Sequence, residues 1–583
     1  MPSDLGYHSA VKTIPRYFLF FILLTLSANA ELRLPNIFGD RMVLQRDQPV
    51  RIWGWADPGE QVKVRFAGQS KSATTGADGS WSLELDPLAA SSERRDFRAG
   101  EITYNNVLVG DVWVLGGQSN MEAALRNIQN GDLEVIAANQ SEIRLMTIPL
   151  RASPKPLDDF PRLDEYNSWS NITERKGDWL ICSPENVDLF SAIGYVFGKR
   201  IHQVTGVPIG LVDTSWGGTT VEAWLSRPAL EAIPESKPLL DHWAAQIAEY
   251  DAEASLKQEI KRWEQRAKKL KAAGKPAPDK PTKPKPSPAV NRNNPAAAYN
   301  GVIAPFERFN IKGALFYQGI NNAVGGARPQ LYAKTYTALI PEWRRVFGQA
   351  ELPFGIIQMV SWGFPPNMQE TETSLVSAAP FIREAQLKAH LAHPNTGFVC
   401  AYDTGHIQMH SPFKSILGER ISRWALATQY GQNVAWKTPI FQKAEFKDGA
   451  ALVSFDEPVH PKYGGRARIE GFVITGIDGH FHPAQASLES SNSCRVWSDL
   501  VKDPVAVRYA WATFPSGTLV TSGSTGLPVA PFRSDTEIWP DAQFENTNVQ
   551  RTHQKKQLER AKEQLRQRKL KEAKLVLEPE DKN

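Results

Sequence analysis

Short apolar segments separated by turns fill residues 32–108 of this 583-residue chain. Four of the segments are strand-like, and the turns between them contain Asp57-Pro58-Gly59 and Ala77-Asp78-Gly79. The predicted strands are residues 42–45, 50–55, 61–66 and 80–85. This pattern predicts a small antiparallel β domain over residues 31–108.

From residue 109 to about residue 435 the pattern changes to apolar strands followed by helices. Three apolar segments, residues 112–115, 208–212 and 314–317, each end at a turn with glycine or polar residues, and a helical pattern over 191–204 separates the first two. This alternation is typical of a parallel sheet with helices on both faces, in which functional sites lie at the carboxyl ends of the strands. We therefore expect the three turns to converge on one site.

An insertion interrupts this α/β region at about residues 237–290. Residues 237–272 form a charged helical segment, and residues 273–288 are rich in Lys and Pro, a composition that predicts an extended, mobile surface linker. A solvated loop is the simpler interpretation of the linker. A basic arm that binds an acidic glycan or a cell surface is the alternative.

Strand-like segments return near the carboxyl end of the chain, at residues 451–455, 471–474, 506–511 and 518–520. They predict a second antiparallel β domain, a sandwich, over residues 436–545. The remaining residues, 546–583, form a highly charged helical pattern whose leucines do not sustain a heptad repeat, so a solvated helical tail is favoured over a coiled coil.

Composition and charge limit the class of protein. A fraction of 42% hydrophobic and 22% charged residues is typical of a globular protein, and 583 residues are too many for a single core. The formal net charge of +4 is close to neutral for this length and the excess lies in the insertion and the tail, so nothing indicates a nucleic-acid partner. The three cysteines, Cys182, Cys400 and Cys494, form neither a disulfide framework nor a Cys-type metal motif.

The amino terminus has the pattern of a signal peptide. Lys12 and Arg16 precede an apolar run over residues 17–26, and Ala28-Asn29-Ala30 supplies a small-x-small cleavage pattern. We expect cleavage near Ala30 and export to the periplasm or the extracellular space, with an uncleaved anchor as the alternative. No later segment reaches about 18 uninterrupted apolar residues, so no membrane span is expected in the mature chain.

The candidate nucleophile is Ser119, which follows the apolar strand pattern of residues 112–115 and the pair Gly116-Gly117. A buried strand that ends in glycines and a small hydroxyl residue before a helix is how serine nucleophiles are presented to a substrate. An ordinary helix-capping serine is the alternative for this segment taken alone. The hypothesis of a nucleophile therefore needs partners from elsewhere in the chain.

The other two strand-end turns and one later segment supply those partners. Glycines in residues 215–220 and 318–322 leave backbone N–H groups unshielded, and such donors stabilise a tetrahedral oxyanion. Asp403, His406 and His410 form the one cluster of histidines and a carboxylate late in the α/β region, which provides a general base. The combination predicts a serine hydrolase, although Met121 stands where a Gly-x-Ser-x-Gly elbow has its last glycine.

Several of these motifs together resemble one known family. They are Gly117-Gln118-Ser119-Asn120-Met121-Glu122, Tyr299-Asn300-Gly301, Tyr317-Gln318-Gly319, Arg383-Glu384-Ala385-Gln386 and the run from Trp216 to Trp224, with further matches at Met42–Arg46, Gly418–Arg420 and Pro531–Asp535. The ordered set is similar to the sialate O-acetylesterase family, a branch of the SGNH hydrolases. The resemblance covers nearly all of residues 32–535 outside the insertion.

The resemblance implies a three-layer α/β/α SGNH-hydrolase domain over residues 109–435, flanked by the two β domains, that removes acetyl esters from carbohydrates without a metal or another cofactor. It implies Ser119 as the nucleophile and His410 as the catalytic histidine. It also implies Gly218, with Gly217 as the second choice, as a backbone oxyanion donor, and Asn322 as the side-chain oxyanion donor.

The sequence departs from the family pattern at two positions. Ile320 replaces an acidic residue of the third motif, and Gln408 stands two residues before His410, where the family has an aspartate. An amide does not stabilise an imidazolium as a carboxylate does. Asp403, Glu419 or a backbone carbonyl are alternatives for orienting His410, and His406 is an alternative base. The primary hypothesis is therefore an active carbohydrate esterase. The alternatives are a sugar-binding homologue with impaired catalysis and a scaffold whose charged insertion and tail make the contacts.

Overall fold

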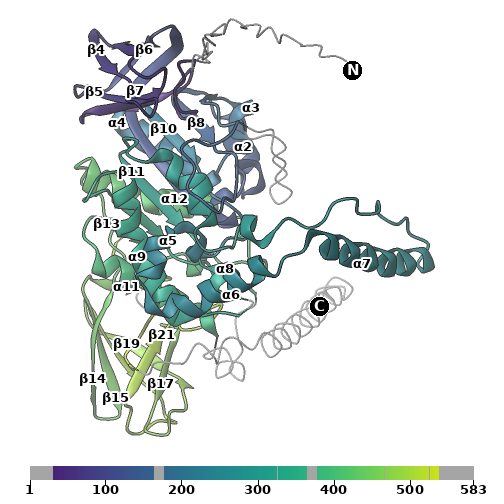
Figure 1. Cartoon of the computed structure of the whole chain (residues 1–583). Helices are drawn as coiled ribbons and strands as arrows, with labels where there is room; N and C mark the ends of the chain where they lie inside the picture. Colours follow the sequence, from purple (N-terminus) through teal and green to yellow (C-terminus); the bar gives the residue numbers. More distant parts are fainter. Residues whose placement is uncertain are drawn as a thin grey trace, which may run out of the picture.

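The computed structural model describes residues 31–162, 176–324, 326–363, 377–464, 467–523 and 525–536. The predicted signal peptide, residues 1–30, and the predicted charged tail, residues 546–583, lie outside these ranges. Figure 1 shows the strands of the amino-terminal and carboxyl-terminal β regions at opposite ends of a central α/β region.

The central sheet has the strand order β13-β12-β11-β7-β10-β8-β9, and every neighbouring pair is parallel except β8 with β9. Its strands are β7 (Ile102–Gly117), β8 (Gln140–Thr147), β9 (Leu180–Cys182), β10 (Ile209–Asp213), β11 (Gly313–Tyr317), β12 (Phe354–Ile357) and β13 (Thr396–Val399). The three strands predicted to end at the site are the central neighbours β11, β7 and β10, so their carboxyl ends lie side by side. The mostly parallel sheet predicted from the sequence is confirmed.

Long helices pack against this sheet. They are α4 (Ala192–Thr205), α9 (Pro329–Val346), α11 (Ala378–Ala392) and α12 (Lys414–Gln429). Trp113 of β7 contacts Phe197 of α4 and Trp424 of α12, with ring centroids 4.9 and 6.2 Å apart. A Cβ on Gly116, three positions later and on the other face, would lie 2.4 Å from Trp343 of α9. Close helix packing on β7 therefore needs a glycine at position 116.

Strand β7 is 16 residues long and belongs to both the central sheet and the amino-terminal β region. Its first half pairs with β1 (Val43–Gln45) and β6 (Ser91–Ala99), and β6 pairs with β3 (Gln61–Phe66), which pairs with β4 (Gln69–Thr74). Strands β2 (Val50–Trp55) and β5 (Ser80–Leu85) form a separate antiparallel pair. The four strands predicted before residue 86 are all present, and the expected boundary at residues 108–109 falls inside β7.

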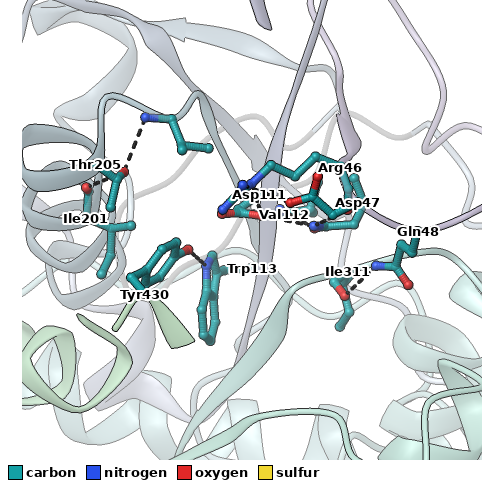
Figure 2. Close-up of polar contacts among 12 residues, drawn as sticks. Arg46, Asp47, Gln48, Asp111, Val112, Trp113, Ile201, Thr205, Ile311 and Tyr430 are labelled. Atoms are coloured by element: carbon teal, nitrogen blue, oxygen red, sulfur yellow. Dashed lines mark hydrogen bonds and ion pairs between the residues drawn. The ribbon is translucent and has the colours of Figure 1, made fainter. Parts of the chain in front are cut away.

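Buried polar contacts join the two regions along β7 (Figure 2). The guanidinium of Arg46 donates to both oxygens of the buried carboxylate of Asp111, at 3.0 and 3.1 Å. Two positions later the indole N–H of Trp113 donates to the hydroxyl of Tyr430 at 3.2 Å. These contacts fix the point at which β7 enters the central sheet.

The carboxyl-terminal region is made of small antiparallel sheets, as predicted. One has the order β14-β15-β20-β19 and another the order β18-β17-β21-β23, with β16 and β22 as a separate pair. The strands are β14 (Phe441–Lys447), β15 (Ala450–Phe455), β16 (Val459–Pro461), β17 (Phe472–Thr475), β18 (His482–Pro483), β19 (Gln485–Ser490), β20 (Ser493–Trp497), β21 (Ala506–Tyr509), β22 (Leu519–Thr521) and β23 (Phe532–Arg533).

This region is tied to the central one by arginines. Arg383 of α11 is fully buried and donates to the carbonyls of Ala512 and Thr513 at 2.6 and 2.8 Å. Arg533 of β23 reaches back to Glu384, with 3.0 Å from Nε to Oε1. These residues belong to motifs that carried the family resemblance, and their contacts give those motifs a structural role.

The insertion contains two helices, α6 (Lys237–Ala248) and α7 (Ala252–Ala272), and α7 projects away from the rest of the molecule (Figure 1). The predicted helices are therefore confirmed. The Lys/Pro-rich segment that follows runs back along α7. The indole N–H of Trp263 donates to the carbonyl of Pro278 at 2.7 Å, and the hydroxyl of Tyr250 donates to the carbonyl of Lys285 at 2.5 Å. The segment has no regular secondary structure and is mostly exposed, as expected of a surface linker, and these two contacts hold it beside α7.

The remaining short helices of the described residues are α1 (Ser119–Glu122), η1 (Leu125–Asn127), α2 (Gly131–Ile136), α3 (Pro184–Val187), η2 (Val221–Trp224), α5 (Arg227–Glu231), η3 (Pro234–Ser236), η4 (Pro288–Val290), η5 (Tyr299–Ile303), η6 (Ala304–Phe306), α8 (Ile320–Ala323) and η7 (Tyr402–Thr404). Within the described ranges no helix is long and apolar enough to cross a membrane. All three cysteines are buried free thiols.

Candidate active site

The turn between β7 and α1 presents Ser119. Gly117, the last residue of β7, has a φ of +122°, and a Cβ at this position would lie 2.2 Å from the carbonyl oxygen of Tyr317 on the neighbouring strand. Only glycine fits a backbone that is both left-handed and this close to another strand. The pair Gly116-Gly117 thus allows β7 to pack tightly up to the residue that begins α1, which is Ser119.

The structure brings Ser119 and His410 together although 291 positions separate them, with 3.0 Å between Oγ and Nε2. His410 lies in the loop between η7 and α12, beyond the carboxyl end of β13. Ser119 is 4% exposed and His410 is partly buried, so substrate would meet a largely desolvated pair. This distance is within hydrogen-bond reach for transfer of the serine proton to the imidazole.

Burial sets the protonation state of the histidine. Desolvation, assisted by the nearby charge of Lys414, lowers the pKa of His410 to about 4. The imidazole is therefore neutral at neutral pH. A neutral imidazole can accept a proton, which is the state that a general base needs.

The turn after β10 offers Gly218 rather than Gly217 as a backbone donor. The N–H of Gly217 donates to the carboxylate of Glu122 at 2.7 Å, whereas no described residue accepts the N–H of Gly218. The carbonyl of Gly218 is held by the side-chain amides of Asn293 and Asn321, at 2.9 and 2.7 Å. These bonds fix the peptide group between Gly218 and Thr219. The N–H of Gly218 remains available to a substrate.

The third turn, after β11, carries Asn322 in α8. Its Oδ1 accepts from the N–H of Val221 at 3.0 Å and from the amide of Gln318 at 2.7 Å, and its Nδ2 donates to Glu222, at 3.1 Å from each oxygen. The side chain of Gln118, which precedes Ser119 in the chain, accepts from the N–H of Gly319 at 3.2 Å. The three strand-end turns are therefore joined by hydrogen bonds into one site, as the sequence pattern predicted.

The residues considered for orienting His410 lie elsewhere. Asp403 forms a bidentate pair with Arg420, 2.7 Å for each bond, and Glu419 forms one with Arg200 at 2.7 and 2.9 Å. Gln408 is exposed. Both carboxylates are thus engaged by arginines.

His406, the alternative base, does not share the contact that His410 makes. Its Nδ1 accepts the N–H of Gln408 at 3.2 Å, and its backbone N–H donates to the carbonyl of Ser361. Of the two histidines in this segment, the structure places His410 against Ser119.

Comparison with known proteins agrees with this geometry. No protein-family model matches the chain. It is 28% identical over 564 residues to a Rattus norvegicus protein named sialate O-acetylesterase, covering 88% of this chain and 96% of that protein, and 26% identical over 552 residues to the Homo sapiens protein of that name. It is also 30% identical to a carbohydrate acetylesterase from Xanthomonas citri of known crystal structure, with a TM-score of 0.69 over 87% of this chain and all of that one. The chain belongs to the sialate O-acetylesterase family.

Three residues at the site of this family member had no role in the sequence-based prediction. Lys414, the first residue of α12, is 1% exposed and its ammonium group donates to Oδ1 of Asn120. The second residue, Asn120, donates in turn from its amide to the carbonyl of Met409 at 3.1 Å. The third, the buried Glu122, accepts a hydrogen bond from the N–H of Gly217. Asn120 and Glu122 lie inside the motif quoted for the family, which was the available signal. A lysine is normally a solvated residue, so no pattern in the sequence indicated a buried role for Lys414.

No group of three or more His, Cys, Asp or Glu side chains in the described part of this sialate O-acetylesterase-family chain is arranged to hold a metal ion. The polar groups gathered at the three turns are amides, backbone N–H groups and a serine–histidine pair. Such groups suit nucleophilic acyl transfer.

Proposed function

We propose that this protein is a carbohydrate esterase that hydrolyses O-acetyl esters on sugars through a serine acyl-enzyme. The observation that carries the proposal is the 3.0 Å contact between Ser119 Oγ and Nε2 of a neutral His410. The names of the rat, human and bacterial relatives support an acetylated carbohydrate as the substrate.

In the first half of the reaction His410 takes the proton of Ser119 while Oγ attacks the acetyl carbon. The resulting tetrahedral oxyanion collapses, the C–O bond to the sugar breaks, and the imidazolium returns its proton to the leaving sugar hydroxyl. Water then attacks the acetyl-serine with His410 again as base. Acetate leaves and Ser119 regains its proton.

Two donors are assigned to the oxyanion, the N–H of Gly218 and a side-chain N–H of Asn322. A primary amide carries two N–H groups, so Asn322 can donate one to Glu222 and the other to the oxyanion of the substrate. The carboxylate fixes which way the amide faces before the substrate arrives. Each such preorganised donor contributes about 3–4 kcal/mol to lowering the barrier.

The proposal includes the expected setting of the site. The region over residues 109–435 is assigned as a three-layer α/β/α SGNH-hydrolase domain, flanked by β domains over residues 31–108 and 436–545. The signal-peptide pattern of residues 1–30 supports export to the periplasm or the extracellular space, which is where acetylated glycans are accessible to an esterase.

The proposal is tested with the mature protein and its Ser119→Ala variant. Wild type is expected to release acetate from O-acetylated sialic acid or from acetylated xylose units, and the variant to lose at least about 10³-fold in kcat/KM. Ser183→Ala is the matched control, because that serine bonds Glu185 outside the site and its loss should leave turnover unchanged. Substantial acetate release by Ser119→Ala would refute the assignment.

The second candidate is a sugar-binding homologue with impaired catalysis. It is favoured by one observation, the exposed Gln408 at the position of the family's aspartate, together with the arginine pairing of Asp403. A serine-directed organophosphonate separates the two candidates, since labelling of Ser119 requires a working nucleophile and base. Glycan binding without labelling, unrescued by Gln408→Asp, would establish the second candidate.

A further inference from the structure

Lys414 is a buried cation beside the nucleophile that has no carboxylate partner among the described residues. Its side chain is 1% exposed, its ammonium group donates to Oδ1 of Asn120, and it lies 5.5 Å from the ring centroid of Tyr317. Burying an ammonium group without a counter-ion is costly, and the pKa of Lys414 is lowered by desolvation to about 7. A residue kept there against that cost calls for a role.

The contacts of Lys414 lead to both members of the candidate pair. Asn120 follows Ser119 in the chain, and its Nδ2 donates at 3.1 Å to the carbonyl of Met409, which precedes His410. One amide side chain therefore bridges the turn that carries the serine and the loop that carries the histidine.

The ammonium group decides which way this bridging amide faces. Because Lys414 only donates hydrogen bonds, it holds Oδ1 of Asn120 on its own side and turns Nδ2 toward the Met409 carbonyl. If the amide rotated by half a turn, its oxygen would face the carbonyl oxygen and the bridge would be lost. Lys414 thus selects one of the two orientations of the Asn120 amide, the one with Nδ2 toward Met409.

Lys414 also acts on His410 through its charge. Other charged groups of the surrounding elements are paired: Asp403 with Arg420, Glu122 with the N–H of Gly217, and Glu222 with the amide of Asn322. Among charged groups, Lys414 is the one whose field shifts His410, and as a like charge it opposes protonation of the imidazole.

We propose that Lys414 is a positioning residue of the Ser119–His410 pair, which orients the Asn120 amide against the Met409 carbonyl and adds a like charge that opposes protonation of the imidazole. Its catalytic consequence rests on the proposed esterase function, whereas its effect on the histidine does not. In other serine hydrolases a carboxylate orients the catalytic histidine. In this chain the hydrogen bond from Asn120 to the carbonyl of Met409, the residue before His410, takes part of that role.

The inference is tested first by NMR titration of the histidine ring in the full-length protein, with the His410 signal assigned from a His410→Gln variant. Lys414→Met removes the charge at similar volume, and we expect the pKa of His410 to rise by about one unit. Lys199→Met is the matched control, because that lysine also lies over a tyrosine ring, 5.3 Å from Tyr195, but pairs with Glu134. It should leave the His410 titration unmoved.

Asn120 variants separate geometry from charge and serve if Lys414→Met does not fold. Asn120→Ala keeps the lysine and breaks the bridge, so kcat should fall about 10–100-fold while the pKa of His410 moves little. Asn120→Asp gives the ammonium a carboxylate and removes the donor to Met409, so it should both raise that pKa and lower kcat. Each effect is expected on kcat, with KM within about twofold.

The outcomes distinguish the two proposals. If folded Lys414→Met and Asn120→Asp both leave the His410 titration and kcat unchanged, the inference is overturned. If the titration shifts as expected but the wild-type protein hydrolyses no acetyl ester, the esterase proposal fails and the electrostatic role of Lys414 stands. Effects of Lys414→Met and Asn120→Ala on kcat that do not add in the double variant would support a single connected path.

Discussion

The amide nitrogen of the partly buried Asn322 lies 3.1 Å from both carboxylate oxygens of the buried Glu222. Oδ1 of Asn322 is held by the N–H of Val221 and the amide of Gln318, and the carboxylate holds the nitrogen of the same amide. The contact also joins η2, which follows the Gly218 turn, to α8, which follows β11. The two donors assigned to the oxyanion are thus held relative to each other before substrate binds.

Glu222→Ala is expected to lower kcat about 10–100-fold, because the nitrogen of the Asn322 amide loses the acceptor that holds it in place. Steady-state kinetics with an acetylated sugar measure the effect. Asn322→Ala should cost at least as much, and the double variant should be no worse than Asn322→Ala alone. Additive losses would show that Glu222 acts through some other residue.

The acid side of the pH–activity profile is expected to follow His410. Its pKa is lowered to about 4, so the base form persists well below neutral pH and kcat/KM should fall only as the pH drops through about 4. The profile is best measured as the rate of organophosphonate inactivation of Ser119 over short incubations. A midpoint near 6.5, the ordinary value for histidine, would contradict the desolvated site described above.

His390 is expected to make the fold sensitive to acid. It bonds Thr396 at 2.8 Å and stacks on Phe398, and burial lowers its pKa to about 4. A histidine with a depressed folded-state pKa stabilises the fold fully above the unfolded value of about 6.5, and this stability is lost as the pH falls toward 4. His390→Gln should therefore lose less stability than wild type between pH 7 and pH 5, as measured by urea unfolding.

Removal of the insertion arm is expected to leave the site intact. Tyr250 contacts Lys285, so a short Gly/Ser linker can replace residues 252–284, while Arg292 and Asn293 continue to hold the carbonyls of Gly217 and Gly218, at 2.7 and 2.9 Å. Turnover should stay within about twofold of wild type.

Asn293→Ala is the contrasting variant for this experiment, since it loosens the Gly218 turn and should lower kcat about tenfold. A folded deletion variant with a tenfold loss of its own would assign the arm a part in substrate handling.

Arg383→Met is expected to lower the free energy of unfolding by about 2–4 kcal/mol. The substitution leaves buried carbonyls of Met359, Ala512 and Thr513 without their donor. Denaturant unfolding measures the change. Arg227→Met, which breaks only an exposed pair with Glu231, should change stability by less than about 1 kcal/mol.

The parts of the site that could be predicted from the sequence were short motifs of consecutive residues. An apolar strand ending in Gly116-Gly117 before Ser119 is a local pattern, and the same holds for the strands that end before Asp213 and Gln318. Adjacent parallel strands necessarily bring their carboxyl ends together. The convergence of the three turns followed from these local patterns.

The remaining features depend on contacts between distant positions. Lys414 is buried because Asn120, 294 residues earlier, supplies an acceptor, and no local pattern reveals that. The Lys/Pro-rich segment packs because Trp263 of α7 reaches Pro278. Composition describes a segment by itself, so it predicted an extended, mobile surface linker but not these contacts.

Strand β7, which leads to Ser119, is paired with neighbouring strands in two regions of the molecule. Its sixteen residues are paired in the amino-terminal region at one end and in the middle of the parallel sheet at the other, so neither region can open without breaking the same strand. Backbone amides from Leu108 to Gly116 should therefore exchange with solvent only through global unfolding. Because Ser119 directly follows this strand, thermal loosening of the outer β strands should leave its geometry in place.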